Sequence, residues 1–187
     1  AFNYAQRYVW AKLWEMVHAG ELVRAVIPKA RQLGMTTAFI AHKIHIANTV
    51  EGREMYMLMH DLKPALTAWR RARAMHEKAV IDGGKNGVPE NLLPRAAIVG
   101  EQKGRLLEFD TGSSLLVESV KKQGAGRGET LHHVHATEIP SWDSPEETMD
   151  GIEESVPELH GFESSIILES TSEGVGDWWY WTVQAAK

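Results

Sequence analysis

The residues best suited to chemistry lie in residues 27–38, where two cations, a glycine and two threonines stand close together. An apolar run, 22–27, precedes this segment, and a helical pattern, 37–47, follows it. The segment therefore joins a predicted buried strand to a helix N-terminus, where unpartnered amides and the helix dipole attract anions. We interpret it as a phosphate-binding loop in which Thr36 or Thr37 can hold Mg²⁺.

This loop departs from the common pattern G-x-x-x-x-G-K-[ST]. Gly34 and Thr36 occupy their expected positions. Met35 stands where the lysine would be, and Lys29 stands where the first glycine would be. A lysine side chain at the start of the loop is flexible enough to place its ammonium on the β- and γ-phosphates, and Arg31 supplies a second cation. The predicted nucleotide-binding residues of the loop are Lys29, Ala30, Arg31, Gln32, Leu33, Gly34, Met35, Thr36 and Thr37.

A second polar segment predicts a strand that ends at Thr137 and Glu138. A carboxylate at such a strand tip can orient water for in-line attack on a phosphate, so Glu138 is the predicted general base. Thr137 replaces the aspartate that usually supports Mg²⁺, which makes it a doubtful metal ligand. Three histidines precede the tip, but no carboxylate or cysteine stands at a suitable metal-ligand spacing, and packing explains them.

A third segment predicts a buried strand, 164–171, that ends in Glu169, Ser170 and Thr171. A glycine turn and an aromatic-rich helix follow it. Since the tips of strands at one edge of an open α/β sheet form a ligand crevice, all three segments are expected to meet there.

In this order the motifs resemble the ATPase (motor) domain of tailed-bacteriophage terminase large subunits, the enzymes that pump DNA into procapsids. The likeness rests on Lys-Ala-Arg-Gln-Leu-Gly-Met-Thr-Thr, on His-Ala-Thr-Glu-Ile-Pro-Ser-Trp and on Glu-Ser-Thr, and it extends from Phe2 to Tyr180. Some terminases have their working lysine at the start of the loop, as Lys29 is here. The resemblance implies that Glu169, Ser170 and Thr171 form the coupling motif, which senses the γ-phosphate and relays hydrolysis to DNA movement.

Two further residues gain a role from this resemblance. Gln6, four residues after Phe2 on a predicted helix, resembles the adenine-recognition glutamine, whereas by itself it would be a surface residue. Arg127 lies in a basic, glycine-rich loop, 121–128, and resembles an arginine finger that reaches a nucleotide on a neighbouring subunit. An ordinary flexible loop is the alternative.

Composition favours one α/β domain. With 187 residues, 43% of them hydrophobic, the chain can bury one sizeable core, and it contains no cysteine for disulfides or thiolate metal sites. The sequence lacks a run of about 18 apolar residues that would span a membrane. The net charge of −5 argues against a surface that binds DNA throughout, although local basic patches remain possible. We expect a single ATPase domain over residues 1–187, without the nuclease domain that follows it in the family.

Periodicity also predicts the remaining elements. We expect a helix over residues 2–16 that stops near Gly20, a second helix from 54 to about 81, a hairpin of strands 105–109 and 114–120, and a helix opened by Ser144. The second helix contains an arginine cluster, 70–73, which is either a solvated face or a contact with DNA or a neighbouring subunit.

The predicted fold is therefore an α/β P-loop NTPase of the additional-strand, catalytic-glutamate type, with a mainly parallel sheet flanked by helices. Its expected function is ATP hydrolysis, with Mg²⁺, that drives double-stranded DNA into procapsids from a homo-oligomeric ring on a portal. The resemblance implies a terminase small subunit as a further partner and the host cytoplasm as the location. A non-hydrolysing, nucleotide-dependent assembly module and a helicase-related or translocase-related ATPase are the alternatives.

Overall fold

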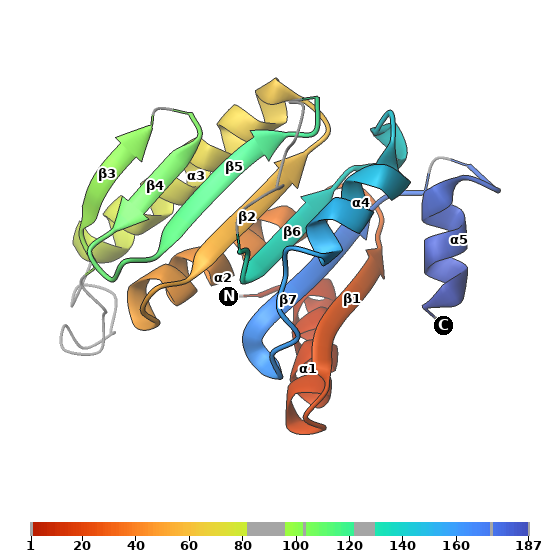
Figure 1. Cartoon of the computed structure of the whole chain (residues 1–187), viewed down its shortest axis with the longest axis horizontal. Coiled ribbons are helices and arrows are strands. Elements are labelled where there is room, and N and C mark those ends of the chain that lie inside the picture. Colours follow the sequence, from red (N-terminus) through yellow and green to blue (C-terminus); the bar gives the residue numbers. More distant parts are fainter. Residues whose placement is uncertain (1, 82–95, 103, 122–129, 173, 187) are drawn as a thin grey trace.

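The structure, a computed structural model, describes residues 2–81, 96–102, 104–121, 130–172 and 174–186. Within these ranges a seven-stranded sheet has the order β1-β7-β6-β2-β5-β4-β3 (Figure 1). The strand β4 is antiparallel to both of its neighbours, and all other neighbouring pairs are parallel. The strands are β1 (Leu22–Pro28), β2 (Glu54–Met59), β3 (Ile98–Gln102), β4 (Leu106–Phe109), β5 (Ser114–Ser119), β6 (His133–Thr137) and β7 (Gly161–Ser170).

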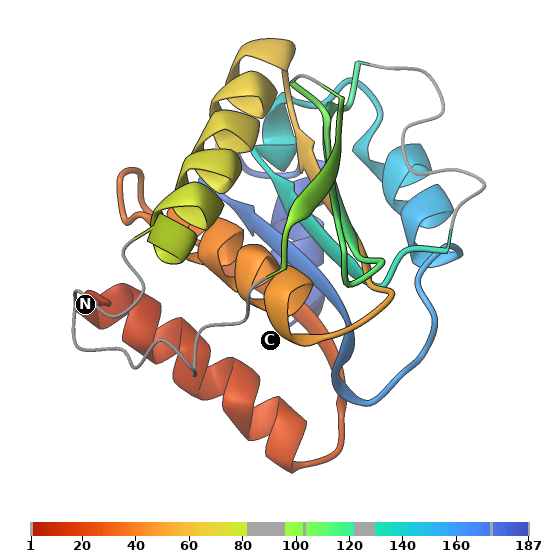
Figure 2. The same cartoon turned by 90° about the vertical axis from the view of Figure 1, so that its left-hand side faces the viewer.

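Helices cover both faces of this sheet. The helices α1 (Tyr4–His18), α2 (Met35–Thr49) and α3 (Leu62–Ile81) lie on one face (Figure 2). On the other face, α4 (Pro145–Glu153) and α5 (Trp178–Ala185) pack into one apolar cluster over β6 and β7. Within the described ranges, no helix has the length and apolar character needed to cross a bilayer.

The order of the central strands matters most for the site. The strand β7 lies between β1, which leads into the predicted phosphate loop, and β6, which carries the predicted acidic tip. All three strands run parallel, so their carboxyl ends meet at one edge of the sheet. This arrangement confirms the mixed α/β architecture with an additional strand between loop strand and acidic strand.

Most of the elements predicted from periodicity are confirmed with small changes in their ends. The first helix, the loop helix, the β4–β5 hairpin and the buried strand β7 all form where the pattern placed them. Ser144 is the N-cap residue of α4, with proline next to it, although its side chain makes no capping hydrogen bond.

The predicted helix from 54 to about 81 is wrong in its first part. Residues Glu54–Met59 form β2, and helix α3 begins only at Leu62. The strand lies in the middle of the sheet, and five of its six side chains are buried because both faces are covered. A continuous apolar run of this kind has no alternation, so periodicity alone does not separate it from the start of a buried helix.

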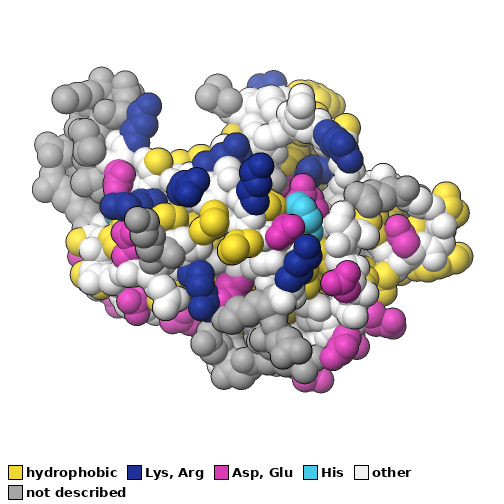
Figure 3. Space-filling model, turned by 90° about the horizontal axis from the view of Figure 1, so that it is seen from above, with side chains coloured by type: hydrophobic (Ala, Val, Ile, Leu, Met, Phe, Trp, Pro, Cys, Tyr) yellow, Lys and Arg dark blue, Asp and Glu magenta, His cyan; other side chains and the backbone are white. Residues whose placement is uncertain are grey.

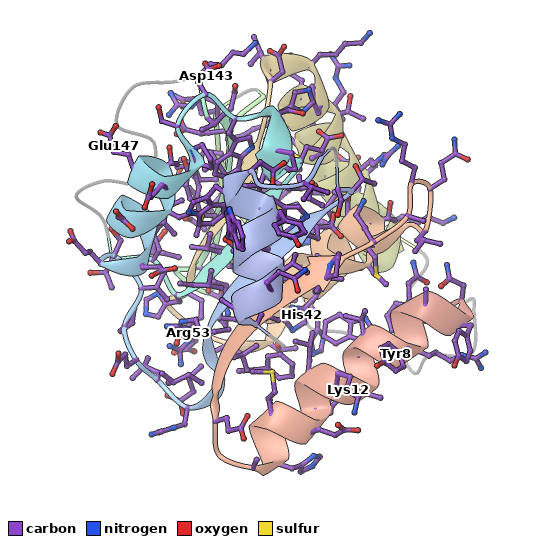
Figure 4. The ribbon with its side chains drawn as sticks, turned by 90° about the vertical axis from the view of Figure 1, so that its right-hand side faces the viewer. Tyr8, Lys12, His42, Arg53, Asp143 and Glu147 are labelled. Carbon is purple, nitrogen blue, oxygen red and sulfur yellow. The ribbon has the colours of Figure 1, made fainter. Side chains whose placement is uncertain are left out.

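The N-terminal helix packs against the loop helix through aromatic rings. Trp10 of α1 contacts both His42 of α2, at 4.7 Å between ring centroids, and Phe162 of β7, at 6.2 Å. Figure 4 labels His42 together with Tyr8 and Lys12 of the neighbouring helix α1. Asn3 caps α1 in a reciprocal capping box with Gln6. This packing holds the start of α1 beside the phosphate loop.

Candidate functional site at the carboxyl edge of the sheet

The loop between β1 and α2 has the geometry of an anion-binding turn. Gly34, the N-cap residue of α2, has a φ of 71°, and Gln32 has a φ of 62°. Gly34 carries no side chain that could cap the helix, so the amides of the first turn are left for an external acceptor. The backbone amide of Lys29 donates to the carbonyl of Ser170 at 2.9 Å, which fixes the start of the loop to the tip of β7.

Met35 and Lys29 have opposite orientations relative to the core. Met35 is 3% exposed and belongs to an apolar cluster with Leu13, Phe39 and Ile167. Lys29, in contrast, lines an open cleft at the carboxyl edge. The residue at the usual lysine position therefore packs the helix against the sheet, and the cation that this loop contributes to the cleft lining is Lys29, at the start of the loop.

That cleft has a volume of about 360 Å³. It brings together residues of the phosphate loop, of the tips of β2 and β6, and of one face of α3. Viewed from above this edge, Lys and Arg side chains gather around a histidine and neighbouring acidic groups (Figure 3). The lining residues are Lys29, Thr36, Met59, Lys63, Pro64, Thr67, Ala68, Arg71, Thr137 and Glu138.

Glu138 stands at the tip of β6 in a strained conformation. Its φ is 58°, a left-handed value that is uncommon for a residue other than glycine. Its carboxylate is about half exposed and contacts Nδ1 of His60, which follows β2. Its amide donates to the carbonyl of Glu169 at 3.3 Å. The carboxylate is thus presented to the cleft while its backbone is tied to the neighbouring strand tip.

Glu169 is fully buried between the phosphate loop and β6. The hydroxyl of Thr36 donates to Oε1 of Glu169, and Nε2 of His135 lies 3.4 Å from the same oxygen. Burial acts to raise the pKa of Glu169, but the neighbouring His135 and the Thr36 hydroxyl outweigh it and lower the pKa. A negative charge is therefore held directly behind the threonine that was predicted to hold Mg²⁺.

Gln6 also lies at the phosphate loop. Its Nε2 donates to the carbonyl of Gly34 at 2.9 Å, and its Oε1 accepts from the amide of Asn3 at 3.0 Å. Asn3 donates in turn to the carbonyl of Leu33 at 3.0 Å. Both ends of the Gln6 carboxamide are engaged in this structure, where they brace the loop.

The other predicted site residues lie at different places in the fold. Thr137 is buried, and its carbonyl accepts a hydrogen bond from Nε1 of Trp142 at 3.2 Å. Ser170 is buried at the end of β7, next to Thr171. Arg127 lies outside the residues that the structure describes. The remaining loop residues, Ala30, Arg31, Gln32, Leu33 and Thr37, surround the entrance to α2.

Sequence reasoning missed four residues around the cleft or left them without a role there: His60, Lys63, Thr67 and Arg71. Lys63, Thr67 and Arg71 are spaced four residues apart, so they share one face of α3. This spacing is readable in the sequence. It has meaning only once the helix is known to begin at Leu62, after a strand whose tip lies beside the phosphate loop.

The donor set fits a magnesium ion that arrives with a nucleotide. Among the described residues, no group of three or more His, Cys, Asp and Glu side chains could hold a metal by itself. The hydroxyl of Thr36, with the carboxylates of Glu138 and Glu169 nearby, offers the hard oxygen ligands that Mg²⁺ shares with phosphates. His133 of β6 is buried, and its Nδ1 contacts the hydroxyl of Ser165 at 3.1 Å within the sheet, so this nitrogen already has a partner away from the cleft.

Comparisons with known proteins bear on the fold. Neither the protein-family models nor the curated protein sequences match the chain. Among solved structures, the large terminase ATPase domain of Thermus phage P74-26 superposes with a TM-score of 0.61 at 15% identity over 90% of this chain. The large terminase of bacteriophage HK97 superposes with a TM-score of 0.61 at 14% identity over 92% of this chain. The chain spans 66% of the first structure's length and 33% of the second's. It therefore has the P-loop NTPase fold of phage large-terminase ATPase domains.

Proposed function

We propose that this chain is the ATP-hydrolysing motor domain of a terminase large subunit, which drives viral double-stranded DNA into procapsids. The supporting observation is the single cleft that unites Lys29 and Thr36 of the phosphate loop with Glu138 at the acidic tip. A phosphate-binding loop alone would fit many nucleotide-binding proteins. A carboxylate exposed to the same cleft adds the group that hydrolysis needs.

Some of these residues bind the nucleotide, and Glu138 accepts a proton. The amides at the start of α2 and the ammonium of Lys29 bind the phosphates, and Arg31 adds a cation at the rim. Mg²⁺, held by Thr36 together with the nucleotide, supplies neutralising charge on the phosphate oxygens. Gln6 sits next to Gly34, where it contacts the purine edge of the nucleotide once its present hydrogen bonds are exchanged.

In the hydrolytic step, Glu138 orients a water molecule and accepts its proton. The water oxygen forms a bond to the γ-phosphorus while the bond to the bridging oxygen breaks, and ADP leaves with that electron pair. His60 contacts the Glu138 carboxylate and holds its orientation. Arg127 from a neighbouring subunit stabilises the charge that develops on the γ-phosphate, so the ring completes the site.

The remaining parts of the proposal concern the assembly. Ser170 and Thr171, at the tip of β7, sense the γ-phosphate and couple its loss to DNA movement. The motor acts as a homo-oligomeric ring on a portal, with a terminase small subunit, in the host cytoplasm. The basic face of α3 at the cleft rim, with Lys63 and Arg71, adds positive charge around the phosphates.

The test is ATP hydrolysis measured against protein concentration, in the presence of double-stranded DNA. We expect turnover that rises more steeply than linearly, because a neighbour supplies Arg127. Lys29→Ala and Arg127→Ala abolish it, and the exposed Lys12→Ala serves as the matched control. Glu138→Gln reduces turnover by about a hundredfold or more while nucleotide binding persists. The control Glu154→Gln changes a residue at the end of α4, on the opposite face of the sheet, and leaves turnover unchanged.

Two results would contradict the proposal. Full turnover by Glu138→Gln would show that Glu138 is not the general base. Tight nucleotide binding without turnover at any protein concentration would point instead to a non-hydrolysing assembly module.

A further inference from the structure

The tips of β6 and β7 carry an unusual pair of side chains. Thr137 and Glu169 are register partners on neighbouring parallel strands, and neighbouring strands lie about 4.8 Å apart. Both residues are buried, and both lie on the sheet face covered by α2, because the alternate residues Ala136 and Leu168 belong to the apolar cluster on the opposite face. Both residues therefore lie next to the same region behind the phosphate loop.

At one of these positions the expected acid is missing. P-loop enzymes hold Mg²⁺ with the loop Ser or Thr and an acidic residue at a strand tip. Thr137 occupies that tip, immediately before Glu138, and it has no charge. Its partner one strand away does have a carboxylate. That carboxylate already accepts a hydrogen bond from the threonine of the loop, Thr36.

The hydrogen bond has the direction that a metal site needs. A threonine hydroxyl has one proton and two lone pairs, so donating the proton to a carboxylate leaves both lone pairs free for a cation. Glu169 accepts this hydrogen bond through Oε1, and its other oxygen, Oε2, is buried without a hydrogen-bond partner among the described residues. Such an unpartnered, buried carboxylate oxygen is costly in a purely structural role.

We propose that Glu169, one strand away from the usual position, is the positioning carboxylate of the magnesium site and replaces the acid absent at Thr137. It orients the Thr36 hydroxyl and places negative charge behind it. This inference rests on the proposed function, and it gives Glu169 a different task from the coupling role that the family resemblance implies. Ser170 and Thr171 keep that coupling role.

The experiment separates nucleotide binding from its dependence on Mg²⁺. The affinity for fluorescent N-methylanthraniloyl-ADP is measured with Mg²⁺ and with EDTA for the parent, Glu169→Gln and the double variant Glu169→Gln/Thr137→Asp. The matched control, Glu163→Gln, changes an exposed carboxylate of the same strand at its other end. Thermal unfolding confirms that each variant is folded, and Glu169→Asp replaces Glu169→Gln if the latter does not fold.

We expect Mg²⁺ to tighten binding to the parent and to the control equally. Glu169→Gln keeps the affinity in EDTA within about twofold but loses about tenfold of the gain from Mg²⁺. The double variant regains most of that gain, because an aspartate at position 137 restores a carboxylate in the adjacent register position. Glu169→Asp keeps the charge at a shorter reach and loses a smaller part of the gain than Glu169→Gln.

Three results would overturn the inference. A full Mg²⁺ gain in Glu169→Gln would show that the carboxylate is not needed, and an equal loss of affinity with and without Mg²⁺ would indicate a purely structural role. Failure of the double variant to regain any Mg²⁺ gain would show that the two strand tips are not interchangeable. The proposed function fails separately, when the parent binds no nucleotide under either condition.

Discussion

The lysine buried in the loop helix makes the stability of this domain depend on pH in an unusual direction. Lys43 of α2 is 0% exposed, and its Nζ has no hydrogen-bond partner among the described residues. Burial lowers its pKa from 10.5 to about 7. We predict that replacing it with methionine, an apolar side chain of similar length, stabilises the domain at pH 7.

The size and sign of the effect follow from proton linkage. In the unfolded chain Lys43 keeps its proton up to about pH 10.5, whereas in the folded domain it releases the proton near pH 7. Between these values the unfolded state binds more protons, so the free energy of unfolding rises with pH. The stability conferred by neutral lysine is complete above about pH 10.5 and is lost as the pH falls to about 7. The full cost of the charged form is about 5 kcal/mol.

The histidines that face Lys43 do not titrate between pH 7 and 10, so they do not contribute to this change in the free energy of unfolding. His133 of β6 and His42 of α2 have their pKa values lowered, mainly by burial, to about 2 and about 3, so both stay neutral from pH 7 to 10. His135, on the same strand as His133, lies beside the carboxylate of Glu169. The difference between parent and variant therefore isolates the lysine.

The assay is urea unfolding, followed by tryptophan fluorescence, at several pH values from 7 to 10. Relative to Lys43→Met, the parent should gain up to about 4 kcal/mol in its free energy of unfolding over this interval. The exposed Lys12→Met is the control, and its profile should run parallel to the parent's. Parallel profiles for the parent and Lys43→Met would refute the reasoning, because they would mean that Lys43 finds a charged partner or water inside the fold.

Two further predictions concern the cleft. Met35→Lys restores the common loop pattern but places a charge at a position that packs in the core, so it should lower the melting temperature. For the same reason, adding Met35→Lys to Lys29→Ala should not restore nucleotide binding. Recovery of binding would show that the helix can turn this side chain outward. Arg71→Ala should weaken nucleotide binding several-fold, and more strongly at low salt. The control Arg70→Ala changes a neighbouring face of the same helix, outside the cleft lining, and should leave binding unchanged. Equal effects of the two variants would exclude a specific role for Arg71.

Local patterns were sufficient to predict the parts of the site that depend on neighbouring residues. A strand, a glycine and a helix start define the loop around Gly34, and a polar strand end defines Glu138. Both signals lie within a dozen residues of chain. Each element could therefore be placed without knowing its neighbours in space.

The parts that were missed depend on contacts between distant segments. The contact between Thr36 and Glu169 joins residues 133 positions apart, and no spacing in the sequence indicates it. The inward orientation of Met35 follows from the space left by Leu13 and Ile167, which come from two other elements. The error at residues 54–59 has the same origin, because the burial of β2 on both faces results from the complete sheet and not from its own six residues.

The positions of strained backbone link these observations to function. Among the described residues, the non-glycine residues with positive φ are Gln32, at 62°, and Glu138, at 58°. Such conformations cost roughly 1–3 kcal/mol each and persist only where the surroundings enforce them. Gln32 lies in the phosphate loop, and Glu138 is held by hydrogen bonds from its own amide to Glu169 and from the amide of Ser141 to its carbonyl. Packing of the core requires neither conformation, since both side chains are exposed. Among the described non-glycine residues, the strain therefore lies in the loop after β1 and at the tip of β6, the two segments that bring Lys29 and Glu138 to the cleft. This is the distribution expected where the orientation of polar groups, and not burial, determines the backbone conformation.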